Sequence, residues 1–299
     1  MPTGETVSAS LGEALPSIIA DARIMREQKS GTWERTATVK RQKEGEGLSY
    51  QWFLINQIDA QDITETTNNQ NFQQFAGNIQ SSEPQMTQVI IKITDRTYRK
   101  VSKNVTSKLG GLAGAAMERK KNKDYLSLFT TFPTTASPGT GNPLSAGHIA
   151  AAVANARSNT TEPAMSPVFT VLHGFQIYDL HLEQVAPVGT YPLPAGMTAD
   201  VFRNGFRGEV NTSMVYEDGN ITLTATPDAN GATHAREGVY AIMGMSIKTE
   251  RDRDMYFGGG ADVVSMTDEY SFVENKTGSS ATTQAFAYRH LSDATAPAS

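Results

Sequence analysis

The stretch DRTYRKVSKNVTSKLGGLAGAAMERKKNKDYLSLFTT, residues 95–131, determines the fold that we expect for the whole chain. Its apolar side chains recur every three or four residues, the spacing of one face of a helix. They are Val101, Val105, Leu109, Leu112 and Ala116. Thr94 or Asp95 can cap the first turn, and Pro133 ends the helix. The sequence therefore predicts one helix of about 30 residues, about 45 Å long at 1.5 Å per residue.

Two features make this helix unusual. Three glycines lie inside it, where each costs about 0.5–1 kcal/mol relative to alanine, and we expect close approach of another backbone to offset that cost. They are Gly110, Gly111 and Gly114. The segment ERKKNKD at 118–124 is polar on every side, so we expect solvent around it. The alternative is two shorter helices with a break near Gly110.

Composition allows one large domain or two and excludes several classes of protein. The chain has 299 residues, a net charge of -5 and no cysteine, which excludes disulfides and thiolate metal sites. Charged residues look evenly spread, without the basic stripe of a nucleic-acid surface. There is no apolar run of about 18 residues, so we expect no membrane segment. The first residues lack the pattern of a signal peptide.

The first part of the chain predicts an arm and a hairpin. Residues 1–32 are expected to form an N-terminal arm that lies on another part of the fold or on a neighbour. Residues 33–63 predict two strands joined by the turn KEGEG at 43–47. The return strand exposes more apolar surface than an isolated hairpin can leave in water. Its large side chains include Tyr50, Trp52 and Phe53. Packing on its own domain and packing elsewhere are equally compatible with these residues.

The segments on either side of the long helix are predicted from local patterns. Residues 64–86 are rich in amides and predict a loop with one short helix around Phe72 and Phe75. Residues 87–94 predict a strand that leads directly into the long helix. After it, residues 132–145 form a linker rich in proline and glycine, and Ser145 caps a second helix.

Beyond a boundary near 160–166 the pattern changes to mixed α/β. A buried strand at 168–173 is followed by a helix with one apolar face. That face would carry Phe175, Tyr178 and Leu182. Further strands are predicted at 209–216, 220–227, 238–250, 263–274 and 282–291. The last two strands are expected to pair with the strand at 87–94, which would make the first domain discontinuous.

No catalytic or metal-binding arrangement is visible. Nucleophile-elbow, phosphate-loop and zinc-protease motifs are absent, and the five histidines show no ligand spacing. We therefore expect no enzymatic activity, no cofactor and no metal. Residues 251–254 alternate in charge, typical of a solvated strand end or of an ion-pair patch between subunits. The segment 118–124 could contact phosphates, but its own acidic residues favour a solvated helix face.

The order of these elements resembles a known family. The segments KLGGLAGAAMERKKNKDYLSLF, SPVFTVLHGFQIYDL and GVYAIMGMSIKTERDRDMYFGGGADVVSMTDEYSFV together look like the major capsid protein of a tailed phage. The resemblance covers nearly the whole chain and rests on element order, because no short motif defines the family. It implies an α+β fold of the Hong Kong 97 type. Such a fold has an N-terminal arm, an extended hairpin loop, a long spine helix, a peripheral domain and an α/β axial domain.

The resemblance implies a division of the chain. The expected parts are an arm at 1–32, an extended loop at 33–66, a peripheral domain at 67–163 and 248–299 with the spine helix at about 95–131, and an axial domain at 164–247. It also implies contacts between subunits. The residues we expect to make them are Tyr50, Trp52, Phe53, Gly110, Gly111, Gly114, Arg251, Asp252, Arg253 and Asp254.

The implied function is structural. Copies of the chain would assemble in the host cytoplasm into hexamers and pentamers of an icosahedral virion head that encloses double-stranded DNA. The implied partners are other copies of the chain, packaged DNA bound without sequence preference, and separate portal and decoration proteins. Residues 1–32 carry no coiled-coil-like run, so we expect a separate scaffolding protein or none, and no N-terminal cleavage. No acceptor for a lysine crosslink stands out.

Two other functions remain open from the residues. A bacterial nanocompartment of the encapsulin type shares the fold and would enclose a cargo enzyme instead of a genome. A soluble ligand-binding protein or an enzyme that uses residues 166–250 belongs to another class. No converging set of polar residues supports that last alternative.

Overall fold

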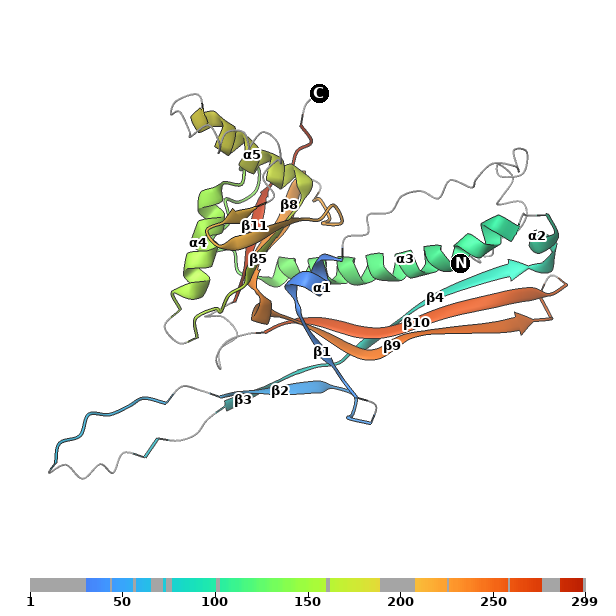
Figure 1. The fold of residues 1–299 in the computed structure, drawn as a ribbon, viewed down its shortest axis with the longest axis horizontal. Helices are drawn as coiled ribbons and strands as arrows, with labels where there is room; N and C mark the ends of the chain where they lie inside the picture. Colours follow the sequence, from blue (N-terminus) through green and yellow to red (C-terminus); the bar gives the residue numbers. More distant parts are fainter. Residues whose placement is uncertain are drawn as a thin grey trace.

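The computed structural model describes most of the chain from residue 31 to residue 297. The residues outside its description are 1–30, 44, 56–57, 66–71, 74–76, 101–102, 160–161, 189–207, 225, 258, 276–285 and 298–299. Almost all of the expected N-terminal arm therefore lies outside the described residues. Figure 1 shows an elongated molecule with a long helix above a long sheet, a group of helices and short strands at one end, and a projecting hairpin.

A four-stranded sheet forms the long body of the molecule. Its strand order is β1-β9-β10-β4, with β1 parallel to β9 and the other neighbours antiparallel. The strands are β1 (Thr38–Arg41), β4 (Gln85–Thr94), β9 (Val239–Asp254) and β10 (Ala261–Glu274). The strands predicted at 87–94, 238–250 and 263–274 are confirmed. The predicted pairing of 263–274 with 87–94 is confirmed too, since β10 pairs with β4 over ten residues.

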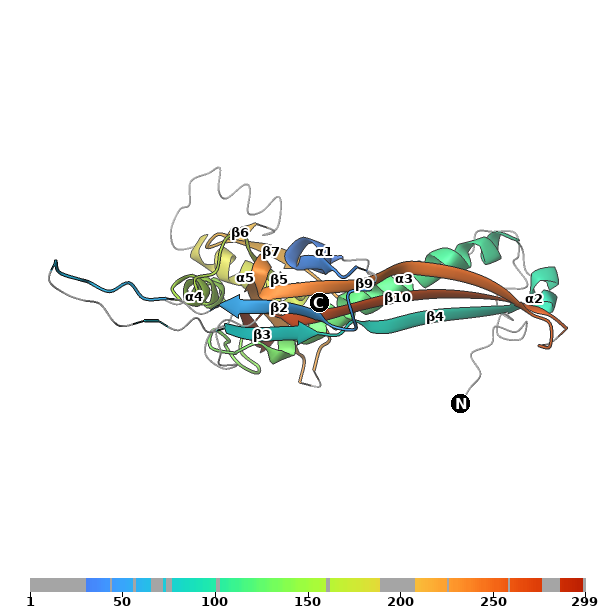
Figure 2. The ribbon, with the colours of Figure 1, turned by 90° about the horizontal axis from the view of Figure 1, so that it is seen from below.

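The predicted long helix is present along one face of this sheet (Figure 2). It comprises α2 (Asp95–Lys100), α3 (Lys103–Ser127) and a final 3-10 turn, η2 (Leu128–Thr131). Thr94 caps its start, because the Thr94 hydroxyl accepts a hydrogen bond from the backbone N–H of Thr97 at 3.3 Å. Because α3 runs through Gly110 without interruption, the alternative of a break there is wrong.

A five-stranded sheet with two helices forms the compact end. Its order is β11-β8-β5-β7-β6. The strands are β5 (Val168–Leu172), β6 (Glu209–Val210), β7 (Ser213–Glu217), β8 (Asp228–Ala235) and β11 (Ala287–Asp293). The helices are α4 (Ala146–Arg157) and α5 (Gly174–Val188), and a short turn, η3 (Arg236–Gly238), leads from β8 into β9. The predicted cap of α4 is confirmed: the Ser145 N–H donates to His148 Nδ1 at 3.2 Å.

Three predictions for this end are wrong. Residues 220–227 form one isolated bridge instead of a strand, and β8 follows them in a segment that we did not assign. The strand near the C-terminus pairs with β8 and belongs to this sheet, although we placed 248–299 in the peripheral domain. On α5, Tyr178 and Leu182 are exposed, while Gln176, Ile177 and Leu180 are buried.

The predicted hairpin exists, but with a different partner strand. β2 (Tyr50–Ile55) pairs antiparallel with β3 (Gly77–Ser82), and β1 pairs with β9 instead of β2. β3 lies in the segment that we predicted as loop, and Phe72 is not helical. Local alternation identified strands near 38–41 and 50–55. The partner of each strand, however, depended on chain segments far away in sequence.

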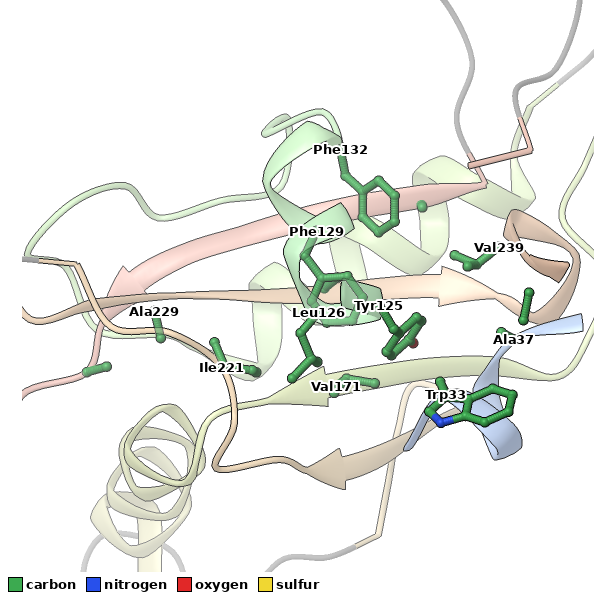
Figure 3. Packing of buried hydrophobic residues seen from close by; sticks show 14 residues of the cluster. Trp33, Ala37, Tyr125, Leu126, Phe129, Phe132, Val171, Ile221, Ala229 and Val239 are labelled. Carbon is green, nitrogen blue, oxygen red and sulfur yellow. The ribbon is translucent and has the colours of Figure 1, made fainter. Parts of the chain in front are cut away.

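The main core lies where the end of the long helix meets both sheets (Figure 3). Tyr125 and Phe129 are fully buried there, with their rings edge-on at 5.0 Å between centroids. A short helix, α1 (Thr32–Thr36), brings Trp33 against this core, 5.8 Å from the ring of Phe272. The apolar core thus joins α1, the end of the long helix and strands of both sheets.

Candidate subunit-interaction surfaces

The two faces of strand β2 have different surroundings. Tyr50, Trp52 and Leu54 alternate with exposed residues and are half-buried against the body of their own chain. The indole Nε1 of Trp52 donates to the Asn275 side-chain oxygen at 3.2 Å, and its ring lies edge-on to Tyr240 at 5.3 Å. This face of the hairpin therefore packs on its own subunit.

The opposite face of the hairpin is apolar and exposed. Phe53, Ile55 and Ile79 are 50%, 57% and 62% exposed. Phe53 lies directly opposite Ile79 across the two strands, and its ring also covers Gly77, where any larger side chain would collide with it. Of the predicted contact residues, only Phe53 is on this face. Sequence analysis missed Ile79 because the short alternation in β3 was hidden in an amide-rich segment.

The glycines of α3 face open space within the chain. An added Cβ at Gly110, Gly111 or Gly114 would meet no atom within 4 Å. The expected close approach of another backbone is therefore not made by the described part of the same chain. A contact with another subunit at these glycines stays a prediction.

We expected solvent around the middle of the long helix, but the structure shows that part of it is buried. Lys121 and Asn122 are buried. Lys121 forms an ion pair with Asp268 of β10, where the two side chains are only 7% and 2% exposed. The error came from the rule that an all-polar helix stays outside a core. Here a buried partner of opposite charge compensates the lysine.

A hydrogen-bonded junction connects α1, α3 and the five-stranded sheet. The Asn122 side-chain nitrogen donates to Asp218 at 2.7 Å, and the Thr32 hydroxyl lies 2.6 Å from the same carboxylate oxygen. Asp218 is fully buried, and the backbone N–H of Asn220 donates to its other oxygen at 2.9 Å. These hydrogen bonds stabilise a carboxylate that has lost its hydration. No sequence signal pointed to this junction.

A second set of connected hydrogen bonds lies beside the junction around Asp218. The ring nitrogen Nδ1 of His234 lies 2.9 Å from the Ala235 carbonyl and donates to it, so Nε2 accepts from the Tyr125 hydroxyl at 2.7 Å. The Thr36 hydroxyl is 2.7 Å from the same tyrosine oxygen. Burial lowers the pKa of His234 to about 4, and burial also raises the pKa of Tyr125. His234 and Tyr125 are therefore both uncharged at neutral pH.

The alternating charges of residues 251–254 are largely paired within the chain. Arg251 contacts Asp262 at 2.5 Å, and Arg253 contacts Asp95 at 2.7 Å. Both arginines are more than half exposed, so each pair contributes little stability. These pairs connect the end of β9 to β10 and to the start of the long helix.

The acidic residues of this segment make other contacts. Lys92 donates to Asp254 at 2.7 Å, which lowers the pKa of that carboxyl. Asp252 accepts a hydrogen bond from the backbone N–H of Arg253 at 2.7 Å. Participation of residues 251–254 in contacts between subunits stays a prediction.

The described residues show no catalytic or metal-binding arrangement. No group of three or more histidine, aspartate or glutamate residues is placed to hold a metal ion among them. An open cavity of about 710 Å³ lies beside Trp33, Met243 and the Lys121–Asp268 pair. Most of its lining comes from outside residues 166–250, where the ligand-binding alternative would place its site. No described helix is long and apolar enough to cross a membrane.

Comparison with known proteins identifies the fold. No family model and no curated protein matches the sequence. Solved phage capsid structures match over nearly the full length of both chains. The capsid of cyanophage Pam1 has a TM-score of 0.70 at 10% identity, covering 98% of this chain and 99% of its own. The capsid of Ralstonia phage GP4 has a TM-score of 0.65 at 12% identity, with coverages of 94% and 95%.

A third similar structure comes from a different kind of particle. The capsid of a native GTA particle has a TM-score of 0.64 at 11% identity and covers 97% of this chain and 99% of its own. All three similarities extend over both sheets, the long helix and the projecting hairpin. The chain therefore has the mixed α and β fold of tailed-phage capsid proteins, the Hong Kong 97-type capsid fold.

Proposed function

We propose that this chain is the major capsid protein of a tailed phage and has no enzymatic role. Copies assemble into hexamers and pentamers of an icosahedral head that encloses double-stranded DNA. The observation that carries the proposal is the likeness to phage capsids over more than nine-tenths of the chain. The packing of the chain agrees with this role. A shell subunit needs apolar surfaces that are exposed in the monomer and covered on assembly, and the hairpin provides one.

The proposed domains follow the observed sheets. The extended loop is the β2–β3 hairpin with the residues between its strands. The peripheral domain contains the four-stranded sheet and the α2–α3 helix, and the axial domain contains the five-stranded sheet with α4 and α5. This division moves β11 from the peripheral domain to the axial domain, because β11 pairs with β8 over seven residues.

The outer face of the hairpin is the proposed contact with a neighbouring subunit. An isolated two-stranded hairpin is marginally stable in water, and this one exposes Phe53, Ile55 and Ile79 on its outer face. Covering these side chains would remove apolar surface from water at about 25 cal/mol per Å². The inner face, with Trp52, is already occupied by the subunit's own sheet.

The two faces give a direct test of the proposal. Substitution of both Phe53→Ser and Ile79→Ser should leave a soluble chain with unchanged circular dichroism that forms no shells in negative-stain electron microscopy. Trp52→Ser should instead lower the melting temperature, because it removes contacts within the chain. Gln51→Ser, a polar change at an exposed position of the same strand, is the matched control and should assemble normally.

The outcomes separate the parts of the proposal. Normal shells from the Phe53→Ser and Ile79→Ser variant would reject the hairpin as a contact between subunits. Monomeric wild-type protein, expressed alone and together with its neighbouring reading frames, would reject the capsid function. Shells that contain a cargo protein instead of DNA would support a nanocompartment.

A further inference from the structure

The charge of this acidic chain is distributed very unevenly. The helical segment 95–127 contains nine lysines and arginines but only three acidic residues, whereas the whole chain has a net charge of -5. Our expectation of evenly spread charge is therefore wrong. The sequence alone did not reveal a basic stripe because the segment alternates basic, apolar and small residues over nearly nine helical turns.

The structure describes six of these nine basic side chains, and five of the six are exposed or half-exposed on α2 and α3. Helix α3 lies over one face of the four-stranded sheet, and α2 lies at the end of the sheet, directly after β4 (Figure 2). Of the six described basic residues, only Lys121 is buried against the sheet. The exposed or half-exposed cations are Arg96, Arg99, Arg119, Lys120 and Lys123.

The other face of the same sheet carries acidic and basic residues in similar numbers. Asp268 and Tyr270 contact α3, so Glu269 between them points to the opposite face, because successive side chains of a strand alternate. Arg253 contacts Asp95 of α2, which places alternate residues of β9 on the far face. The charged residues described there are Glu250, Asp252, Asp254, Glu269, Lys40, Lys92 and Lys248, and the carboxylates of Asp254 and Glu250 are ion-paired with Lys92 and Lys248. The sheet therefore has a basic helical side and an opposite side of mixed charge, part of which the β2–β3 hairpin covers.

We propose that the α2–α3 side of the peripheral domain binds the phosphate backbone of double-stranded DNA. This inference rests on the proposed capsid function and adds to it which side of the subunit faces the packaged DNA. Exposed lysines and arginines on an otherwise acidic protein match the charge of a duplex and give binding without sequence preference. The opposite face of the sheet then faces away from DNA, toward the outside of the shell.

The side chains on this surface favour nucleic acid over a protein partner. Stable protein interfaces are built around buried aromatic or aliphatic anchors. Among the described side chains of α2 and α3, Tyr98 is the only large apolar residue that is more than a third exposed, at 37%. An acidic scaffolding protein would lack such anchors on this surface.

The test compares two pairs of lysines on opposite sides of the sheet. The variant K120Q/K123Q removes two exposed cations from the helical side, and K92Q/K248Q removes two from the far side. The pairs are matched, because each contains a lysine that is ion-paired with an aspartate. Binding of a random-sequence duplex to the unassembled full-length protein is measured by fluorescence anisotropy between 50 and 200 mM salt.

The expected result is a difference in salt dependence. Each phosphate contact contributes about 0.9 to the slope of log K against log salt, so K120Q/K123Q should lose up to about 1.8 of that slope. Between 50 and 200 mM salt, the factor by which the affinity of this variant falls should be about ten times smaller than the factor for the wild type. The K92Q/K248Q variant should keep the wild-type slope.

Other results overturn the inference. Equal slopes for both variants and the wild type would show that the helical side does not contact DNA. Binding of an acidic scaffolding protein, without binding of the duplex, would assign this side to a protein partner. Negative-stain electron microscopy of the same proteins, expressed together with their neighbouring reading frames, keeps the two levels apart. If K120Q/K123Q forms shells and binds DNA with the wild-type salt dependence, only this inference is rejected. If the wild-type protein forms no shells, the capsid function is rejected.

Discussion

At the scale of single residues, the buried Lys121–Asp268 pair gives the sharpest prediction. Lys121→Met leaves the Asp268 carboxylate buried without its cation, so we expect a loss of about 3–5 kcal/mol in the free energy of unfolding. The double variant Lys121→Met and Asp268→Leu removes both charges and should recover most of that loss. Urea unfolding of the unassembled protein, followed by tryptophan fluorescence, measures both.

A neighbouring lysine provides the control for this experiment. Lys123 is exposed two residues further along the same helix, and Lys123→Met should change the unfolding free energy by less than about 0.5 kcal/mol. If Lys121→Met were equally mild, the pair would not be buried in solution as it is in the structure.

The buried histidines predict how stability changes with pH. Burial lowers the pKa values of His234 and His290 to about 4, below the usual 6.5. Between these values the unfolded chain binds more protons than the folded chain, so stability falls as the pH drops from about 6.5 to about 4. Each histidine contributes about 1.4 kcal/mol per pH unit within that window.

Substitution of one histidine tests this contribution. His234→Gln removes the titrating group from the core, so the urea midpoint should fall less steeply between pH 6.5 and pH 4 than it does in the wild type. An unchanged slope in His234→Gln would mean that other groups cause the acid sensitivity.

At the scale of elements, the glycines of α3 separate stability from assembly. An alanine Cβ at Gly111 would meet no atom of the same chain within 4 Å. Gly111→Ala should therefore stabilise the unassembled protein by about 0.5–1 kcal/mol, because alanine favours the helix. If a neighbouring subunit packs closely on this glycine, as we propose, the same variant should form fewer shells.

A glycine in the axial sheet is the matched comparison. At Gly231 a Cβ would lie only 2.5 Å from the side chain of Leu172 and 3.0 Å from the Val171 carbonyl oxygen. Gly231→Ala should therefore destabilise the unassembled chain. Normal shell yield from Gly111→Ala would show that the glycines of α3 serve no contact between subunits.

The elements also show where local sequence patterns stop being informative. The strand at 87–94 and the helix at 174–185 were predicted correctly, because alternation and helical periodicity are properties of adjacent residues. The partner of β2 was predicted wrongly, because a strand near a glycine turn pairs either with its neighbour in sequence or with a more distant segment. On α5 the buried face includes Gln176, whose amide donates to Ser292 at 2.6 Å, so polarity misled the assignment.

At the scale of the whole molecule, each domain combines distant segments. The four-stranded sheet takes its strands from both halves of the chain, and β11 near the end completes the axial sheet with β8. The short helix α1 and the end of α3 join the two sheets through Asp218, which lies 96 positions beyond Asn122. Relative movement of the domains therefore has to disturb this buried polar junction.

The sequence by itself determined the long helix, most strands of the body, the absence of known catalytic motifs, and a resemblance to capsid proteins that the fold confirms. These are consequences of local periodicity and element order. Only the tertiary structure decided the strand partners, the burial of Lys121 and Asn122, and the separation of the hairpin into an occupied face and an exposed one. The physical reason is that strand pairing and the compensation of buried charge depend on residues that are brought together only when the chain folds.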